Sequence, residues 1–148
     1  MLCYTIGTSI NCFMPLLKTY LVEDSPLIRE SLIAMLEDLA QVEVVGTAED
    51  EWSAVQWLTN PDNHADLVIV DIFLKVGSGL GVLRNTIGST RHSNTVVLTN
   101  YATEDMKLKC LELGADQVFD KSNDIDALIT YCSRLHGDRK STTRPALL

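Results

Sequence analysis

The chain has 148 residues, a length that suits one domain of ordinary size better than two. Hydrophobic residues make up 46% and charged residues 22% of it, and this globular composition excludes a disordered chain. The formal net charge of -8 disfavours direct binding to nucleic acid, and no apolar run approaches the ~20 residues that cross a bilayer.

An N-terminal extension, residues 1–16, precedes the predicted fold. It is mildly apolar, but no Lys or Arg precedes its apolar part and polar residues interrupt it, so it makes a poor signal peptide. We expect either a flexible extension or a start codon assigned too early, with translation beginning at Met14.

The cysteines show no C-x-x-C spacing, and two of them fall inside predicted amphipathic helices. This pattern indicates reduced thiols and a cytoplasmic protein. The residues concerned are Cys3, Cys12, Cys110 and Cys132.

Residues 17–136 alternate short apolar runs with helical patterns, in five strand–helix units. This alternation predicts one α/β domain, a doubly wound (βα)5 fold in which helices cover both faces of a five-stranded parallel sheet. The expected strands are residues 18–22, 42–48, 66–70, 95–98 and 117–119. The expected helices are one from the Ser25 cap to about Leu39, then residues 51–59, 82–87, 103–114 and 125–135.

The sequence also predicts which face of the second helix is buried and where the last helix ends. Trp52, Val55 and Leu58 are spaced to face the core. Residues 137–148 are expected to form a frayed, solvated tail that carries a few basic side chains.

Polar side chains stand at the ends of four predicted strands: Glu23 and Asp24, then Asp71, Thr99 and Lys121. In an open parallel sheet, ligands bind outside these carboxyl ends. If the strands are neighbours, three carboxylates meet, and two unit charges about 4 Å apart repel by roughly 4 kcal/mol at an effective dielectric near 20. A positive group must therefore sit among them.

Carboxylate and carbonyl oxygens suit Mg²⁺, and Lys121 supplies a second positive charge. Together they form a place where Asp71 can receive a phosphoryl group, with the Thr99 hydroxyl as a hydrogen-bond donor. Each residue alone has an ordinary structural explanation as a cap or a surface charge, and their joint occurrence carries the prediction.

Over about residues 17–135 the chain resembles the receiver domains of bacterial two-component response regulators, in the segments TYLVEDSPLIRESL, DLVIVDIFLKVGSGLGVL, VVLTNYA and GADQVFDKS. The resemblance implies the flavodoxin-like strand order 2-1-3-4-5 and a bound Mg²⁺. It also implies that Asp71 is the phosphoacceptor, that Asp24 binds the metal directly and that Glu23 binds it through water. The backbone carbonyl of Phe73 would be a further metal ligand, beside Asp71 itself.

The same resemblance implies a phosphorylation-dependent signalling switch that accepts its phosphoryl group from a sensor histidine kinase or a phosphotransfer protein. Thr99 and Lys121 match the residues that contact the phosphoryl group and couple it to the face formed by the fourth helix, fifth strand and fifth helix. A downstream protein target would bind that face, and a homodimer through it is left open. Such a protein is not an enzyme on other substrates, since it catalyses only its own Mg²⁺-dependent phosphorylation and dephosphorylation.

Two alternatives within the family remain open. About a dozen residues after the last predicted helix cannot hold a helix-turn-helix, so we expect output by protein contact. The basic tail is also compatible with the receiver part of a truncated two-domain transcription regulator. The second alternative is a degenerate receiver that binds partners without phosphate.

Three positions depart from the family pattern. Val118 stands where an aromatic residue is common, with Phe119 one step later. Ser122 replaces the proline that usually follows the lysine, and Asn100 is bulkier than the usual Ala or Gly. We expect the aromatic switch of the family to be altered here.

Rival functions fit the residues less well. A hydrolase with an aspartyl-phosphate intermediate needs a second carboxylate two residues after its nucleophile, where Phe73 stands. A flavodoxin-like carrier needs a phosphate loop where Glu23 and Asp24 would repel phosphate. The run GSGLG at residues 77–81 is followed by Val82 in place of the last fingerprint glycine, and we interpret it as a flexible loop beside the acceptor.

Overall fold

A computed structural model describes the backbone of residues 2–6, 9–13, 15–90 and 93–142, and the side chains of 15–90 and 93–138. Two N-terminal strands, β1 (Leu2–Ile6) and β2 (Ser9–Phe13), pair antiparallel in a sheet of their own. The predicted flexible extension therefore contains a hairpin, although Met14, the alternative start, lies outside the described residues. A two-stranded hairpin by itself is only marginally stable in water.

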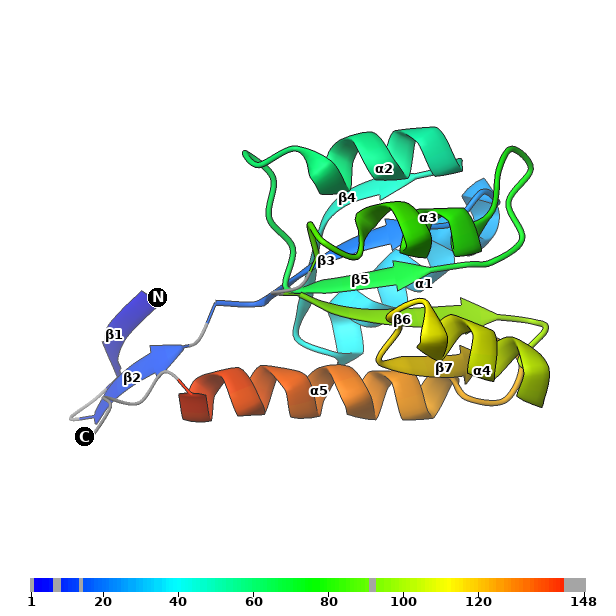
Figure 1. Cartoon of the computed structure of the whole chain (residues 1–148). Coiled ribbons are helices and arrows are strands. Elements are labelled where there is room, and N and C mark those ends of the chain that lie inside the picture. Colours follow the sequence, from blue (N-terminus) through cyan, green and yellow to red (C-terminus); the bar gives the residue numbers. More distant parts are fainter. Residues whose placement is uncertain (1, 7–8, 14, 91–92, 143–148) are drawn as a thin grey trace.

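The main sheet has five parallel strands in the order β4-β3-β5-β6-β7, which confirms the predicted order 2-1-3-4-5 (Figure 1). The central strand β5 is buried along its whole length because helices cover both faces of the sheet. The strands are β3 (Leu17–Val22), β4 (Val42–Ala48), β5 (Leu67–Val70), β6 (Asn94–Thr99) and β7 (Gln117–Asp120).

Five helices follow these strands in turn: α1 (Pro26–Leu39), α2 (Glu51–Thr59), α3 (Gly79–Thr86), α4 (Glu104–Glu112) and α5 (Ile125–Thr142). Helices α1 and α5 pack on one face of the sheet, where Leu36 and Leu128 join the cluster around Ile69. Helices α2, α3 and α4 cover the other face (Figure 1). The doubly wound α/β prediction is confirmed.

Side-chain caps explain where four helices begin. The first turn of each helix receives an oxygen from the preceding Ser, Asp or Thr, which satisfies an otherwise unpaired amide. The Ser78 hydroxyl accepts from the Leu80 amide at 3.0 Å, so α3 begins at Gly79 and not near Val82 as the sequence predicted. The apolar spacing located the buried part of this helix and missed its glycine-containing first turn.

Two other expectations were wrong in detail. Trp52 is 71% exposed, and the buried residues of α2 are Ala54 and Leu58. Helix α5 continues through Gly137 to Thr142, so residues 137–142 are helical and do not form the frayed tail expected there. The last residues, 143–148, lie outside the described part.

The two helical cysteines, Cys110 and Cys132, are buried free thiols, as predicted. Burial raises the pKa of the Cys132 thiol to about 12, so this group stays protonated and unreactive at neutral pH. Within the described residues, no helix has both the length and the apolar character that a membrane span requires.

The packing of α1 yields a paired test. Leu36 is fully buried and Leu39, on the same helix, is 58% exposed. We expect Leu36→Ala to lower the free energy of unfolding by about 3 kcal/mol, because it leaves a cavity between α1 and the sheet. Leu39→Ala is the matched control and should change it by less than about 0.5 kcal/mol. Urea unfolding measures both, and equal losses would contradict this assignment of the core.

Candidate functional site

The parallel register places the predicted polar residues at one edge of the sheet. Val22 lies opposite Val70, and the Asp71 amide donates to the Val22 carbonyl at 3.0 Å. The residues after β3 therefore lie beside those after β5. Further along the same edge of the sheet, the Lys121 amide donates to the Thr99 carbonyl at 3.0 Å.

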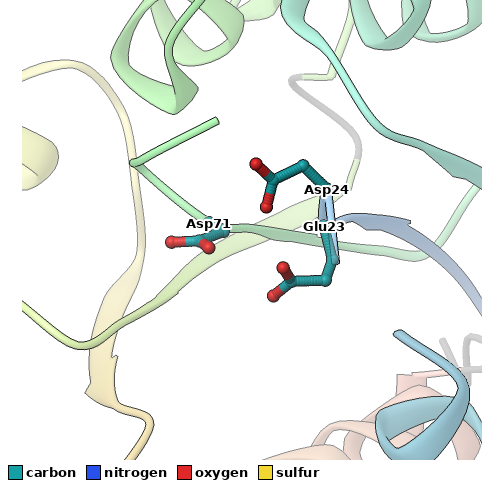
Figure 2. Close-up of side chains that lie close together, drawn as sticks. All are labelled: Glu23, Asp24 and Asp71. Carbon is teal, nitrogen blue, oxygen red and sulfur yellow. The ribbon is translucent and has the colours of Figure 1, made fainter. Parts of the chain in front are cut away.

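Three carboxylates gather at this edge, as Figure 2 shows. One oxygen each from Glu23, Asp24 and Asp71 lies within 4.8 Å of the others. Glu23 is only 2% exposed and Asp71 8%, whereas Asp24 is half-buried and closer to solvent. The expected meeting of three acidic side chains is present.

Lys121 provides the positive charge that the carboxylates require. Its ammonium donates to Glu23 Oε1 at 2.5 Å and to Asp71 Oδ2 at 2.8 Å. Burial opposes the charge of this ammonium, but hydrogen bonds from it and the charges of Asp71 and Glu23 outweigh burial, so the pKa of Lys121 is raised. The lysine therefore stays protonated at neutral pH.

One ammonium does not balance the cluster. With three ionised carboxylates and one lysine, the site carries a formal net charge of -2. Hard carboxylate oxygens at such short mutual distances suit a divalent cation such as Mg²⁺. The residues present therefore fit the predicted metal.

Backbone amides from the neighbouring loops also bind the carboxylates. Asp24 Oδ2 accepts from the Lys75 amide at 2.8 Å, and Asp71 Oδ1 accepts from the Phe73 amide at 3.4 Å. The loop between β5 and α3 is thus attached to two acidic side chains. The role of the Lys75 amide was not predicted, because nearly every residue type has a backbone amide and the sequence does not show which one binds a side chain.

Arg29 was also missed by the sequence analysis. Its guanidinium donates to the Glu23 carbonyl at 2.9 Å and to Glu49 Oε1 at 3.0 Å. It therefore ties the first turns of α1 to the chain after β3 and β4. The position of Arg29 one turn after the Ser25 cap was the available signal.

Thr99 lies fully buried at the end of β6. Its hydroxyl oxygen accepts from the Tyr101 amide at 3.2 Å, so the threonine is bonded to the loop that leads to α4. The Tyr101 ring packs against that of Phe73, with 4.5 Å between centroids and a tilt of 60°. Both residues are more than half exposed.

The departure from the family pattern at Val118, on β7, has a structural explanation. Val118 packs with the cluster that includes α4, while Phe119 is buried on the opposite face of the sheet. There its ring contacts that of Tyr131 edge-on, at 5.7 Å. Because side chains alternate along a strand, Phe119 does not share the face on which Val118 lies.

The other two residues that depart from the family pattern, Ser122 and Asn100, lie next to each other. The Ser122 hydroxyl donates to Asn100 Oδ1 at 3.5 Å, which joins the loops after β7 and β6. Ser122 also takes part in a short turn, since its amide donates to Asp120 Oδ1 at 2.7 Å. The two substitutions are therefore parts of one local arrangement.

A family model described as the response regulator receiver domain matches residues 19–133. The chain is 32% identical over 105 residues to the protein-glutamate methylesterase/protein-glutamine glutaminase of Hydrogenovibrio crunogenus, covering 69% of this chain and 27% of that protein. It is 29% identical over 100 residues to response regulator UvrY of Escherichia coli K12, covering 68% of this chain and 45% of that protein. The chain thus spans less than half the length of these relatives.

Solved structures show the same fold. The response regulator domain of Thermotoga maritima CheB aligns with a TM-score of 0.72 at 17% identity, covering 82% of this chain and 97% of that one. The receiver domain of the Francisella response regulator 1452 aligns with a TM-score of 0.72 at 19% identity, covering 83% and 98%. At these identities the likeness concerns the fold alone.

The ion pairs of Lys121 generate a stability prediction. We expect Lys121→Met to lower the free energy of unfolding by about 3 kcal/mol near pH 7, because it leaves two buried carboxylates without their counter-ion. Thermal unfolding at pH 7, without added Mg²⁺, measures the loss.

In the wild type, the raised pKa of Lys121 determines how the stability contributed by its ion pairs changes with pH. Its contribution is present below the ordinary lysine pKa of about 10.4 and is lost only as the pH rises through the folded-state value. Lys109→Met, at an exposed position on α4, is the matched control and should have little effect. An equal loss from both variants would rule out the ion pairs as the cause.

Proposed function

This chain belongs to the response regulator receiver domain family, and from that membership we propose that it is a phosphorylation-dependent switch whose phosphoacceptor is Asp71. The observation that carries the proposal is the placement of Asp71. Its carboxylate stands at the end of the central strand, bonded to Lys121 through Oδ2 and close to two other carboxylates. This is the position at which an open parallel sheet binds ligands.

The proposed reaction is transfer of a phosphoryl group to an Asp71 oxygen. Oδ1 is the better candidate for attack, because its contact with the Phe73 amide is long, at 3.4 Å, while Oδ2 is held by the lysine. A P–O bond forms, and the P–N bond of a partner's phosphohistidine breaks with its electron pair returning to the imidazole. With acetyl phosphate as donor, the bond that breaks joins phosphorus to acetate.

Mg²⁺ is the proposed cofactor, with Asp24 and Asp71 as direct ligands, Glu23 as a ligand through water and the Phe73 carbonyl as a further ligand. Support comes from the three acidic side chains and their uncompensated charge. When bound, the ion supplies positive charge for the carboxylates and for the phosphoryl oxygens. A metal bound by Asp24 would withdraw electron density from the carboxylate that accepts from the Lys75 amide, and this makes metal binding observable in the loop.

Thr99 and Lys121 are the proposed links from the phosphoryl group to the rest of the fold. Lys121 would exchange part of its contact with Asp71 and Glu23 for the phosphoryl oxygens. The Thr99 hydroxyl would donate to the same group, and its bond to the Tyr101 amide would carry the movement into the loop before α4. A conformer that exists before phosphorylation then gains population.

We propose that the output is contact of a downstream protein with the face formed by α4, β7 and α5. Leu108 and Leu111 are exposed apolar side chains on α4 that such a partner would cover. The proposed donor is a sensor histidine kinase or a phosphotransfer protein, and the proposed location is the cytoplasm, where buried thiols such as Cys110 stay reduced. The alternative proposal is that two copies of the chain associate through this face.

No catalytic activity beyond this self-directed chemistry is proposed. The methylesterase named for one relative belongs to that longer protein, of which this chain spans 27%. Two other candidates are the receiver part of a two-domain transcription regulator, and a receiver that binds partners without phosphate. The buried lysine bonded to both Glu23 and Asp71 favours a site built for phosphoryl chemistry over the phosphate-independent candidate.

Phosphorylation is tested on the intact protein with Mg²⁺ and acetyl phosphate, followed by mass spectrometry. We expect a single phosphoryl adduct on the wild type and none on Asp71→Asn, because the amide oxygen is a poor nucleophile. Asp126→Asn, at an exposed position on α5, is the matched control and should be labelled like the wild type. Labelling of Asp71→Asn to the wild-type extent would refute the proposed acceptor, and no adduct on any variant would favour the phosphate-independent receiver.

Metal binding is tested separately by titrating Mg²⁺ while recording amide resonances. We expect the Lys75 amide resonance to shift in the wild type, because its acceptor Asp24 would bind the metal. Asp24→Asn should weaken binding by about tenfold or more, since it removes a charged ligand. Unchanged affinity in this variant would show that the acidic cluster is not the metal site.

A further inference from the structure

The glycine run that follows the acceptor strand is closely packed on the residues around it. A methyl group at Gly79 would lie 2.1 Å from the Asp71 carbonyl oxygen. The Gly79 amide also donates to the Ile72 carbonyl at 2.8 Å. Helix α3 therefore starts directly against the backbone of the proposed phosphoacceptor, and residues 79–81, predicted as part of a loop, are helical.

The other two glycines of the run make room for Glu51, the first residue of α2. A methyl group at Gly77 would lie 2.4 Å from Glu51 Cβ, and one at Gly81 would lie 2.3 Å from Glu51 Oε1. Gly77 also has a φ of +82°, a conformation that side chains with a Cβ rarely adopt. One glutamate thus occupies the space that two glycines leave open.

Hydrogen bonds hold Glu51 in that space. Its Oε1 accepts from the Ser78 amide at 3.0 Å, and its Oε2 accepts from Asn85 Nδ2 at 3.5 Å. The Glu51 amide donates to the Val76 carbonyl at 3.3 Å. The glutamate therefore contacts the loop, the cap and the second turn of α3 at once.

The charge of Glu51 also suits its place. The first amides of a helix carry partial positive charge, and a carboxylate beside them is favourable. Ser78 already caps α3 through its hydroxyl, which accepts from the Leu80 amide. The Ser78 amide would lack an acceptor within α3, and the carboxylate of Glu51, on α2, accepts from it.

We infer that Glu51 is a positioning residue for Asp71. Through Ser78 and Gly81 it sets where the first turn of α3 lies, and through Gly79 that turn fixes the backbone of Asp71. The orientation of the Asp71 carboxylate toward a donor depends on this backbone. The effect on phosphorylation rests on the proposed function, whereas the effect on backbone position does not.

The test is a double-mutant cycle between Glu51 and Gly81. Glu51→Ala removes the carboxylate, and Gly81→Ala pushes it away from Ser78, so both changes act on one contact. We expect each to slow labelling by acetyl phosphate about fivefold, the loss expected for one hydrogen bond that orients the acceptor. Combined, they should be no slower than Glu51→Ala alone, because the three atoms nearest the added methyl all belong to the Glu51 carboxylate group and are then gone.

Two comparisons separate positioning from a general loss of structure. Glu51→Gln keeps the shape and an oxygen that accepts from Ser78, so it should restore labelling to near the wild-type rate. Glu30→Ala, which removes an exposed carboxylate on α1, should leave labelling unchanged. Amide resonances of Asp71 and Gly79 should move in Glu51→Ala and Gly81→Ala and stay in place in Glu51→Gln.

The outcomes distinguish this inference from the proposed function. If the wild type is not labelled, the proposed function fails, while the amide shifts still test the position of Asp71. Unmoved Asp71 and Gly79 resonances in Glu51→Ala would overturn the inference. So would rate losses that multiply in the double variant, since independent effects would then act at the two residues. If Glu51→Ala does not fold, Gly81→Ala alone tests the same contact, and Asp71 and Gly79 resonances that stay in place in this variant would overturn the inference.

Discussion

The buried ammonium of Lys121 is the contact on which the site depends. Two nearly inaccessible carboxylates, Glu23 and Asp71, share this one counter-ion, and either would be costly to bury alone. Lys121 follows β7, so its side chain reaches past β6 and β5 to the residue after β3. Thr99, at the end of β6, is fully buried. The position of the charge in the site therefore depends on the strand order.

In this site, polar and charged side chains accept hydrogen bonds from backbone amides of the surrounding loops. The oxygens of Asp24 and Asp71 that face away from the lysine accept from amides of the loop before α3, and Thr99 accepts from an amide of the loop before α4. Phosphoryl oxygens on Asp71 would compete with these acceptors for the amides and for the ammonium. The proposed response would then appear as movement of main-chain segments, which is the form in which a partner protein can detect it.

The sequence predicted the parts that depend on local pattern. The alternation of strands and helices, the cap at Ser25 and the acidic side chains at strand ends follow from periodicity and residue type. Helical spacing assigned both Trp52 and Leu58 to the core, but α2 buries Leu58 and Ala54 and leaves Trp52 exposed. The direction of Phe119 depends on which residue begins the strand, and a shift of one residue reverses it.

The features that the sequence did not predict have a common physical origin. The Lys75 amide on Asp24, the Ser122 contact with Asn100 and the place of Glu51 in the glycine run all join segments far apart in the chain. None leaves a periodic signal, since each depends on one atom meeting another after the sheet has formed. They surround the acceptor because the sheet fixes only where its strands end. The loops beyond those ends have no ladder of hydrogen bonds, so individual side chains must determine their positions. In this protein the first turn of α3 is held by a glutamate of α2, and the shape of the site is therefore shared between two units of the fold.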